Sequence, residues 1–270
     1  MRICLLLVLA GCCEAAISQP PDAKAIVRRS VGTVEADWNR APGFSYLERD
    51  VESKRSSKPT VRTYQVFMVE GSPYRRLVRI DDRPLSPGDQ AEEDRRMRRE
   101  IVRRQHESDR DRRNRIGKFE KERRHDHAML LNMVDAFDFR LTGEQLVNGH
   151  ECWVFNALPK PGYQPKDRET RVLAGMRGTL WIDKQQYQWV RVKAEVFKPV
   201  SFYGFVAKVG PGTRFFLEQQ PVEADLWLPT RFDVQVNATA FGFIDESSTD
   251  NETYTDYRAN PKVSALLTHP

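Results

Sequence analysis

Cysteine is scarce in this sequence and unevenly placed. The 270-residue chain has four cysteines, and three of them, Cys4, Cys12 and Cys13, lie within the first 16 residues. Only Cys152 remains in the rest of the chain, which excludes a disulfide within the folded part and a zinc site built from cysteines. Cys152 lies in an apolar stretch with no base marked nearby, so we interpret it as a core residue rather than a nucleophile.

Long hydrophobic runs are also missing. The longest, residues 3–10, has eight residues, whereas a helix needs about 20 to cross a bilayer. Because Arg2 precedes this run and small residues follow it, residues 1–16 are predicted to be a signal peptide or a lipoprotein signal. A buried strand is the alternative interpretation.

The apolar run ends in Leu9-Ala10-Gly11-Cys12, which resembles a bacterial lipobox. In that motif the cysteine carries acyl chains and becomes the first mature residue, so Cys12 is the candidate lipidation site. Ordinary cleavage behind Ala15 or Ala16 stays open as the alternative. Both interpretations predict export.

Sequence signatures of catalysis are absent. The chain contains no G-x-S-x-G, H-E-x-x-H or P-loop motif, and no G-x-G-x-x-G after a strand pattern. His125 and His127 are two residues apart and would point to different faces of a helix, so we interpret them as part of a solvated face. We therefore predict a protein that is not an enzyme, with no catalytic residues, no bound metal and no cofactor.

The hydrophobic pattern predicts both helices and strands. Residues 22–38 carry an apolar stripe with helical spacing, which ends before Ala41-Pro42-Gly43. Strand patterns rich in β-branched and aromatic residues follow, with hairpin signals at Gly71 and at Asn148-Gly149. The expected strands are residues 44–51, 60–70, 74–80, 137–142, 152–158, 178–183, 188–197, 213–218, 226–236 and 253–257.

One highly charged helical segment interrupts these strands. Between Asp89 and Asp126 there are 14 Lys or Arg and 11 Asp or Glu residues, many of them in opposite-sign pairs four apart. Residues 103–115 contain no apolar side chain, so we expect a solvent-exposed helix there, with breaks at Ser108 and Gly117. Because acids nearly match bases, nucleic acid is not expected as a partner.

The order of these elements predicts an α+β fold. We expect residues 22–260 to form a single domain around one large curved antiparallel sheet, with helices covering one face. The charged helical insertion at 86–134 belongs to this domain, and residues 261–270 form a C-terminal tail.

Several segments carry a resemblance to a known family. They are Gly178-Thr179-Leu180-Trp181-Ile182-Asp183 before Trp189-Val190-Arg191-Val192, Leu226-Trp227-Leu228-Pro229-Thr230-Arg231-Phe232, and the terminal Tyr254-Thr255-Asp256-Tyr257-Arg258. Together with the element order over residues 22–260, they resemble the LolA/LolB-type lipoprotein-carrier superfamily, and more closely bacterial envelope proteins of the outer-membrane lipoprotein-sorting type. The resemblance implies an unclosed β-barrel with helices as a lid over an apolar cavity for acyl chains. The charged insertion departs from that pattern.

This resemblance leads to a functional hypothesis. We expect non-catalytic binding of lipid or lipoprotein acyl chains in the periplasm or at the outer membrane. The alternative is an envelope scaffold or sensor that binds a protein partner through the charged helix. An apolar cluster that simply closes the sheet is the competing interpretation of the candidate lipid-binding residues, which are Val31, Val34, Trp38, Phe119, Met129, Met133, Phe202, Phe205 and Phe215.

Overall fold

The computed structural model describes residues 22–54, 58–167, 169–201, 207–240, 244–245 and 247–261. The predicted signal at 1–16 with Cys12, and the candidate residues Phe202 and Phe205, lie outside the described residues. Within the described ranges, no helix is both long and apolar enough to cross a membrane.

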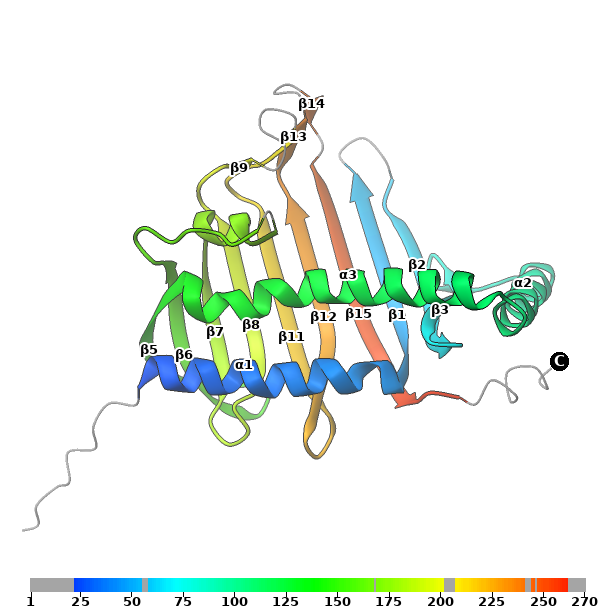
Figure 1. Cartoon of the computed structure of the whole chain (residues 1–270), viewed down its shortest axis with the longest axis horizontal. Helices are drawn as coiled ribbons and strands as arrows, with labels where there is room; N and C mark the ends of the chain where they lie inside the picture. Colours follow the sequence, from blue (N-terminus) through cyan, green and yellow to red (C-terminus); the bar gives the residue numbers. More distant parts are fainter. Residues whose placement is uncertain are drawn as a thin grey trace, which may run out of the picture.

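One antiparallel sheet of 11 strands dominates the molecule (Figure 1). Its order is β4-β3-β2-β1-β15-β12-β11-β8-β7-β6-β5, so the first strand, β1, pairs with the last strand, β15. The sheet is open, which confirms the expected α+β class. Its strands are β1 (Phe44–Lys54), β2 (Thr60–Val69), β3 (Ser72–Ile80), β4 (Arg83–Pro84), β5 (Phe137–Val147), β6 (His150–Pro159), β7 (Met176–Asp183), β8 (Trp189–Val196), β11 (Arg214–Glu223), β12 (Leu226–Val236) and β15 (Ser248–Ala259).

Three α-helices begin at capped residues. Helix α1 (Ala23–Arg40) follows Asp22, whose carboxylate accepts hydrogen bonds from the N–H groups of Lys24 and Ala25. Helices α2 (Pro87–Gln105) and α3 (Asp109–Ala136) are capped in the same way by Ser86 and Ser108. The break expected at Ser108 is confirmed, but the one expected at Gly117 is wrong, because α3 continues through this residue with open space around it.

Helices α1 and α3 lie across the same face of the sheet (Figure 1). Helix α3 packs against β3 near its beginning and against β5 and η2 (Glu169–Gly175) near its end, with α1 alongside. Helix α2 stands beside β3, at the opposite end of the molecule from β5. The remaining elements are η1 (Ala41–Gly43) and a small four-stranded sheet of β9 (Val200–Ser201), β10 (Ala207–Val209), β13 (Ala238–Ala240) and β14 (Ile244–Asp245).

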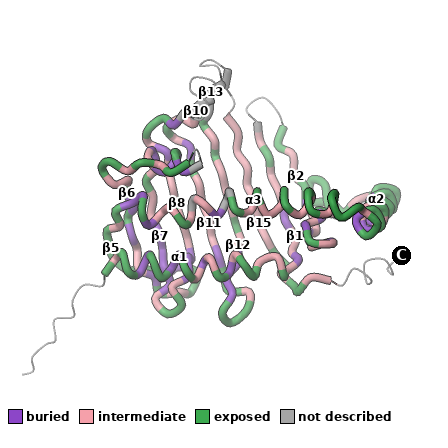
Figure 2. Tube along the Cα trace, viewed as in Figure 1, coloured by how far each residue is buried: buried purple, intermediate pink, exposed green. Residues whose placement is uncertain are grey.

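Two apolar clusters hold α1 and α3 to the sheet. The α1 cluster joins Ile26, Val27, Val31, Val34 and Val134 of the helices to the sheet residues Phe155, Leu180, Ile182 and Trp189. The η2 cluster contains Ala136, Phe137, Ala157, Val172, Leu173, Val196 and Val200. Figure 2 shows that buried residues gather under α1 and on the β5–β8 side, while the middle of the sheet is mostly intermediate.

Helix α2 is attached by a third cluster. Met97 and Ile101 pack against Phe67, Val69 and Tyr74 of the β2–β3 hairpin. Met97 and Ile101 are the buried apolar residues of this highly charged helix, whereas the neighbouring Val102 is 48% exposed, so these two form its packed stripe.

The arginine-rich stretch 103–115 is not uniformly solvated, and the expectation that it would be is wrong. The Arg104 side chain is only 8% exposed and donates hydrogen bonds to the backbone oxygens of Val69, Ser72 and Pro73. Arg115 donates to the Ser72 hydroxyl and to the backbone oxygen of Glu70. A segment without apolar side chains can therefore pack, because guanidinium groups satisfy buried carbonyls.

Candidate functional site

The α1 cluster and the η2 cluster meet beneath the last turns of α3. Met133 of α3 and Phe139 of β5 each pack against both clusters, and both side chains are only partly buried. We call this meeting line the apolar seam. A flexible methionine at such a line can adapt to apolar partners of different shapes.

A cavity of about 410 Å³ adjoins the η2 cluster. We call it the seam cavity. Tyr163 lines the cavity and also packs against the η2 cluster, while Ala174 and Phe197 line it directly after the cluster residues Leu173 and Val196. The other lining residues are Pro159, Lys160, Pro161, Gly162 and Lys198.

Two lysines give the seam cavity its charge. The ammonium group of Lys160 donates to the backbone oxygens of Val134 and Asp135 at 3.0 and 2.8 Å, which neutralises the carbonyl end of α3. Lys198 is exposed and lies over the Phe197 ring, with its nitrogen 5.4 Å from the ring centre. The cavity thus combines an apolar, proline-rich wall with a cationic rim.

The structure places the predicted lipid-binding residues in different surroundings. Val31 and Val34 are buried core residues of the α1 cluster, and Met133 lies at the seam. Phe215 packs against the η2 cluster from β11. The side chain of Met129 is outside what the structure describes, as are Phe202 and Phe205, so their assignment stays a prediction.

Trp38 and Phe119 lie away from the seam, where α1 and α3 touch. The guanidinium carbon of Arg123 is 3.8 Å from the centre of the Trp38 ring and 5.5 Å from that of Phe119. His127 stacks on Trp38 with ring centres 4.3 Å apart. Because His127 is only 8% exposed, its interpretation as part of a solvated face is wrong.

Sequence reasoning missed the wall of the seam cavity. Pro159 ends β6, and Pro161 and Tyr163 belong to the loop between β6 and η2, which the proline and glycine content marks only as irregular. No periodic pattern shows where such a loop folds back. The available signal was the one aromatic residue, Tyr163, in an otherwise polar loop.

Cys152 is buried among Val147, Trp181, Val190 and Trp227. Burial, and next the nearby Asp183 carboxylate, raise the pKa of its thiol to about 12. Little thiolate then exists at neutral pH, as expected of a core residue. In the part of the chain that the structure describes, His, Cys, Asp and Glu side chains nowhere gather in threes that could hold a metal ion.

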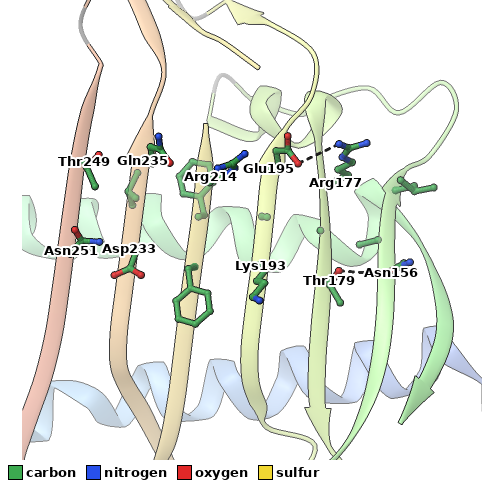
Figure 3. A pocket seen from close by; sticks show the side chains of 17 residues that line it. Asn156, Arg177, Thr179, Lys193, Glu195, Arg214, Asp233, Gln235, Thr249 and Asn251 are labelled. Carbon is green, nitrogen blue, oxygen red and sulfur yellow. Dashed lines mark hydrogen bonds and ion pairs between the residues drawn. The ribbon is translucent and has the colours of Figure 1, made fainter. Parts of the chain in front are cut away.

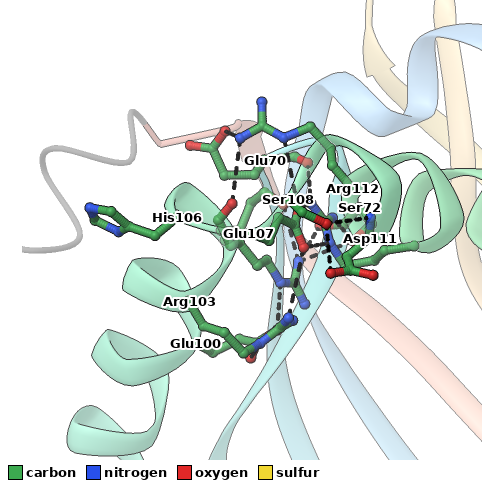
Figure 4. Close-up of polar contacts among 12 residues, drawn as sticks. Glu70, Ser72, Glu100, Arg103, His106, Glu107, Ser108, Asp111 and Arg112 are labelled. Atoms are coloured by element: carbon green, nitrogen blue, oxygen red, sulfur yellow. Dashed lines mark hydrogen bonds and ion pairs between the residues drawn. The ribbon is translucent and has the colours of Figure 1, made fainter.

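The junction of α2 and α3 is a network of ion pairs (Figure 4). Glu107, whose side chain is 3% exposed, contacts Arg115, Arg112 and Arg103. Glu100 forms a two-bonded pair with Arg103 at 2.7 Å and also accepts from Arg104. These hydrogen bonds hold the pKa of Glu100 at about 2.

Comparisons with known proteins add only a fold-level likeness. No protein-family model matches the chain, and no curated protein is similar to it in sequence. Among solved structures, a DUF1329 family protein from Desulfovibrio piger is 17% identical, with a TM-score of 0.38 over 90% of this chain and 98% of its own.

Two further solved structures are similar in the same way. A putative outer membrane lipoprotein-sorting protein domain from Vibrio parahaemolyticus is 10% identical, with a TM-score of 0.36 over 89% of this chain and 97% of its own. A LolA superfamily protein from Nitrosomonas europaea is 9% identical, with a TM-score of 0.35 over 93% of this chain and 99% of its own. The superfamily that the sequence resembles is thus among the matches, and at these TM-scores nothing about ligand, partner or location follows from them.

Proposed function

We propose that this protein binds the acyl chain of a lipid or lipoprotein without catalysis, and that the chain enters the seam cavity and extends along the apolar seam. The observation that carries the proposal is the continuity of the cavity with the η2 cluster through Tyr163. From there the partly buried Met133 leads on to the α1 cluster.

The chemistry of the site suits an acyl chain with an anionic head. Each buried CH₂ group contributes about 0.8 kcal/mol, so a chain needs an apolar wall and little else. Lys198, which forms no ion pair with another described residue, can meet a carboxylate or phosphate at the rim. The candidate residues Phe202 and Phe205, which lie beyond the described ranges and follow β9 in the sequence, belong to the same proposal.

The proposed location is the bacterial cell envelope. The apolar run and the lipobox-like ending at Cys12 support export, either with a lipid anchor or after ordinary cleavage. The more specific role that we propose in the envelope is lipoprotein sorting or transport.

Titration with a fluorescent C16 fatty acid tests the proposal. We expect saturable binding by the parent protein, and a loss of at least about tenfold in affinity for Met133→Glu, because a buried charge at the seam opposes an apolar ligand. Phe197→Glu should act in the same direction from the cavity side.

The matched control is Leu131→Glu, which introduces the same charge two residues away on α3, where the side chain is 45% exposed. It should bind like the parent. Circular dichroism checks that each variant keeps the sheet. A folded parent that binds no probe, or equal losses for Met133→Glu and Leu131→Glu, would contradict the acyl-chain site.

A protein partner on α2 is the second candidate function. Arg95, Arg96, Arg99 and Arg103 expose more than half of their side chains, each beside a glutamate. Such a mixed-sign surface favours a partner of complementary pattern over a uniformly charged one. Mass analysis of the purified protein separates the two functions: retained lipid supports the acyl-chain site, and an empty site with one specifically bound protein supports the scaffold.

A further inference from the structure

A second cavity, of about 640 Å³, lies on the sheet rather than at the seam. Figure 3 views it from the side of the sheet away from α1 and α3, which appear behind the strands. Ala157 and Phe215, which pack against the η2 cluster on the helix side, alternate along their strands with the polar lining residues. The polar lining side chains therefore face away from the helices and from the proposed acyl-chain site.

Two cross-strand rows of side chains form this polar groove. The first row runs through direct register partners from β6 to β15, and the second from β7 to β15 (Figure 3). Strands lie about 4.8 Å apart, so the first row is a ladder of about 24 Å. The first row is Asn156, Thr179, Lys193, Phe216, Asp233 and Asn251, and the second is Arg177, Glu195, Arg214, Gln235 and Thr249.

Two cations of the groove have no ion-pair partner among the described residues, although the Lys193 nitrogen lies 5.6 Å from the centre of the Trp181 ring. Lys193 and Arg214 form no ion pair with any described residue, although both lie in the middle of the rows. By contrast, Arg177 pairs with Glu195 at 3.3 Å, and Arg231 at the groove's side pairs with Asp233 at 2.6 Å. Both side chains are exposed, so both are free to meet a ligand from solvent.

An aromatic ring lies at the centre of the same surface. Phe216 is half-buried, and the charged groups of Arg191, Lys193 and Arg231 lie 5.9, 5.9 and 5.1 Å from the centre of its ring. Its direct register partners are Lys193 and Asp233, and the amide and hydroxyl side chains lie farther along the two rows. The groove therefore offers an apolar platform, positive charge and a ladder of hydrogen-bonding groups in one open channel.

We propose that this polar groove binds an extended acidic glycan. Sugar rings present hydroxyls to Asn, Gln and Thr side chains and an apolar face to Phe216. Carboxylates on the glycan form ion pairs with Lys193 and Arg214. An uncharged glycan offers these two cations no ion-pair partner. Five cations around the groove (Arg177, Arg191, Lys193, Arg214, Arg231) face three carboxylates (Glu195, Glu218, Asp233), which leaves a modest excess of positive charge. Net charge does not distinguish an acidic glycan from nucleic acid, so a nucleic-acid probe belongs to the test.

Isothermal titration with hexagalacturonate tests the proposal, with cellohexaose as the uncharged probe and single-stranded oligo-dT as the nucleic-acid probe. We expect binding of hexagalacturonate only, weakening as salt rises. The double variant Lys193→Gln/Arg214→Gln should lose at least about tenfold in affinity. Phe216→Ala should weaken binding while leaving the salt dependence unchanged.

The matched control is Lys121→Gln/Arg124→Gln, which removes the same charge from exposed positions on α3. It should bind hexagalacturonate within about twofold of the parent. Absence of hexagalacturonate binding by the folded parent would overturn the proposal. So would equal losses in both double variants, or equal affinity for oligo-dT, since each result would mean attraction to net charge alone.

Discussion

Asp250 of β15 and Asp50 of β1 are two carboxyl groups that share one hydrogen bond on the sheet. Burial first, and then the hydrogen bond and repulsion from Asp50, raise the pKa of Asp250 to about 6. The register places Glu52 opposite Asp250 and Glu252 opposite Asp50, and like charges directly opposite each other destabilise a strand pair. Arg75 provides part of the compensation through ion pairs with Asp50 and Glu48.

This pair predicts a stability that falls between pH 4 and pH 6. The folded state holds a proton on Asp250 that the unfolded state, with a pKa of 3.8, has already released, so raising the pH favours unfolding in this window. Asp250→Asn removes the repulsion and keeps a hydrogen-bond donor for Asp50. We expect it to stabilise the protein at pH 7 by about 1–2 kcal/mol and to have little effect at pH 4.

Urea unfolding at pH 4 and at pH 7 measures the change in the free energy of unfolding that Asp250→Asn causes at each pH. Asp138→Asn, at an exposed position on β5, is the control and should change stability little at either pH. Equal effects of Asp250→Asn at pH 4 and pH 7 would show that the gain comes from somewhere other than the shared proton.

The burial of a single residue was predictable where one sequence pattern determined it. Val31 and Val34 fall on the apolar stripe of α1, and a stripe has only the core to pack against. Arg104 and His127 were not predictable, because their burial depends on which turn or ring the folded chain brings next to them. A polar residue in a helical pattern carries no mark of its tertiary partner.

At the scale of elements, the α2–α3 junction depends on Arg104. Its guanidinium replaces the missing apolar contacts by bonding three backbone oxygens, the Ser72 hydroxyl and Glu100. We expect Arg104→Ala to cost about 3 kcal/mol in the free energy of unfolding, because it leaves buried acceptors without donors. Arg104→Lys should recover only part of this loss, since an ammonium group cannot reproduce the planar fork.

Chemical denaturation, with hydrogen exchange of the β2–β3 hairpin, measures this loss. Arg99→Ala, at a side chain that is 64% exposed, is the control and should change stability by less than about 0.5 kcal/mol. If both substitutions have equally small effects, the junction is held by Met97 and Ile101 alone.

The same junction predicts an acid-labile contribution from Glu100. Its pKa is lowered to about 2, chiefly by the hydrogen bond from Arg103, so its ion pairs contribute above its ordinary pKa of 4.5 and are lost as the pH falls towards 2. Glu100→Gln should remove that part of the acid dependence, which the same denaturation experiment at pH 3 and pH 7 detects.

Helix boundaries were predicted correctly where a capping side chain determines them locally. Ser86 and Ser108 satisfy the first N–H groups of their helices whatever the rest of the chain does, so capping could be inferred from sequence. The helix break predicted at Gly117 was wrong because a glycine inside a helix costs only about 1 kcal/mol of helix stability relative to alanine. The packing on either side of Gly117 offsets this cost. Strand register could not be inferred, since several strands can present an equally apolar face.

At the scale of the whole molecule, the sheet separates two surfaces of different chemistry. Its helix side carries the apolar clusters and the seam, and its other side carries the polar groove. Alternation and helical stripes predict one large antiparallel sheet with a helix cover, and the family resemblance implies that the sheet is unclosed. It does not predict the groove, whose rows come from six strands spread over residues 150–259 and exist only once the register is set.

The proposed attachment of the whole molecule to a membrane depends on Cys12. If the lipobox interpretation holds, two acyl chains on this cysteine bind the envelope stably, whereas a single chain gives only marginal attachment. Cys12→Ala should then abolish labelling with radioactive palmitate and release the protein from the membrane fraction. Cys13→Ala is the matched control and should keep both, because only Cys12 follows Leu9-Ala10-Gly11. A parent protein that takes up no label, and fractionates like Cys12→Ala, would leave ordinary cleavage behind Ala15 or Ala16 as the account of export.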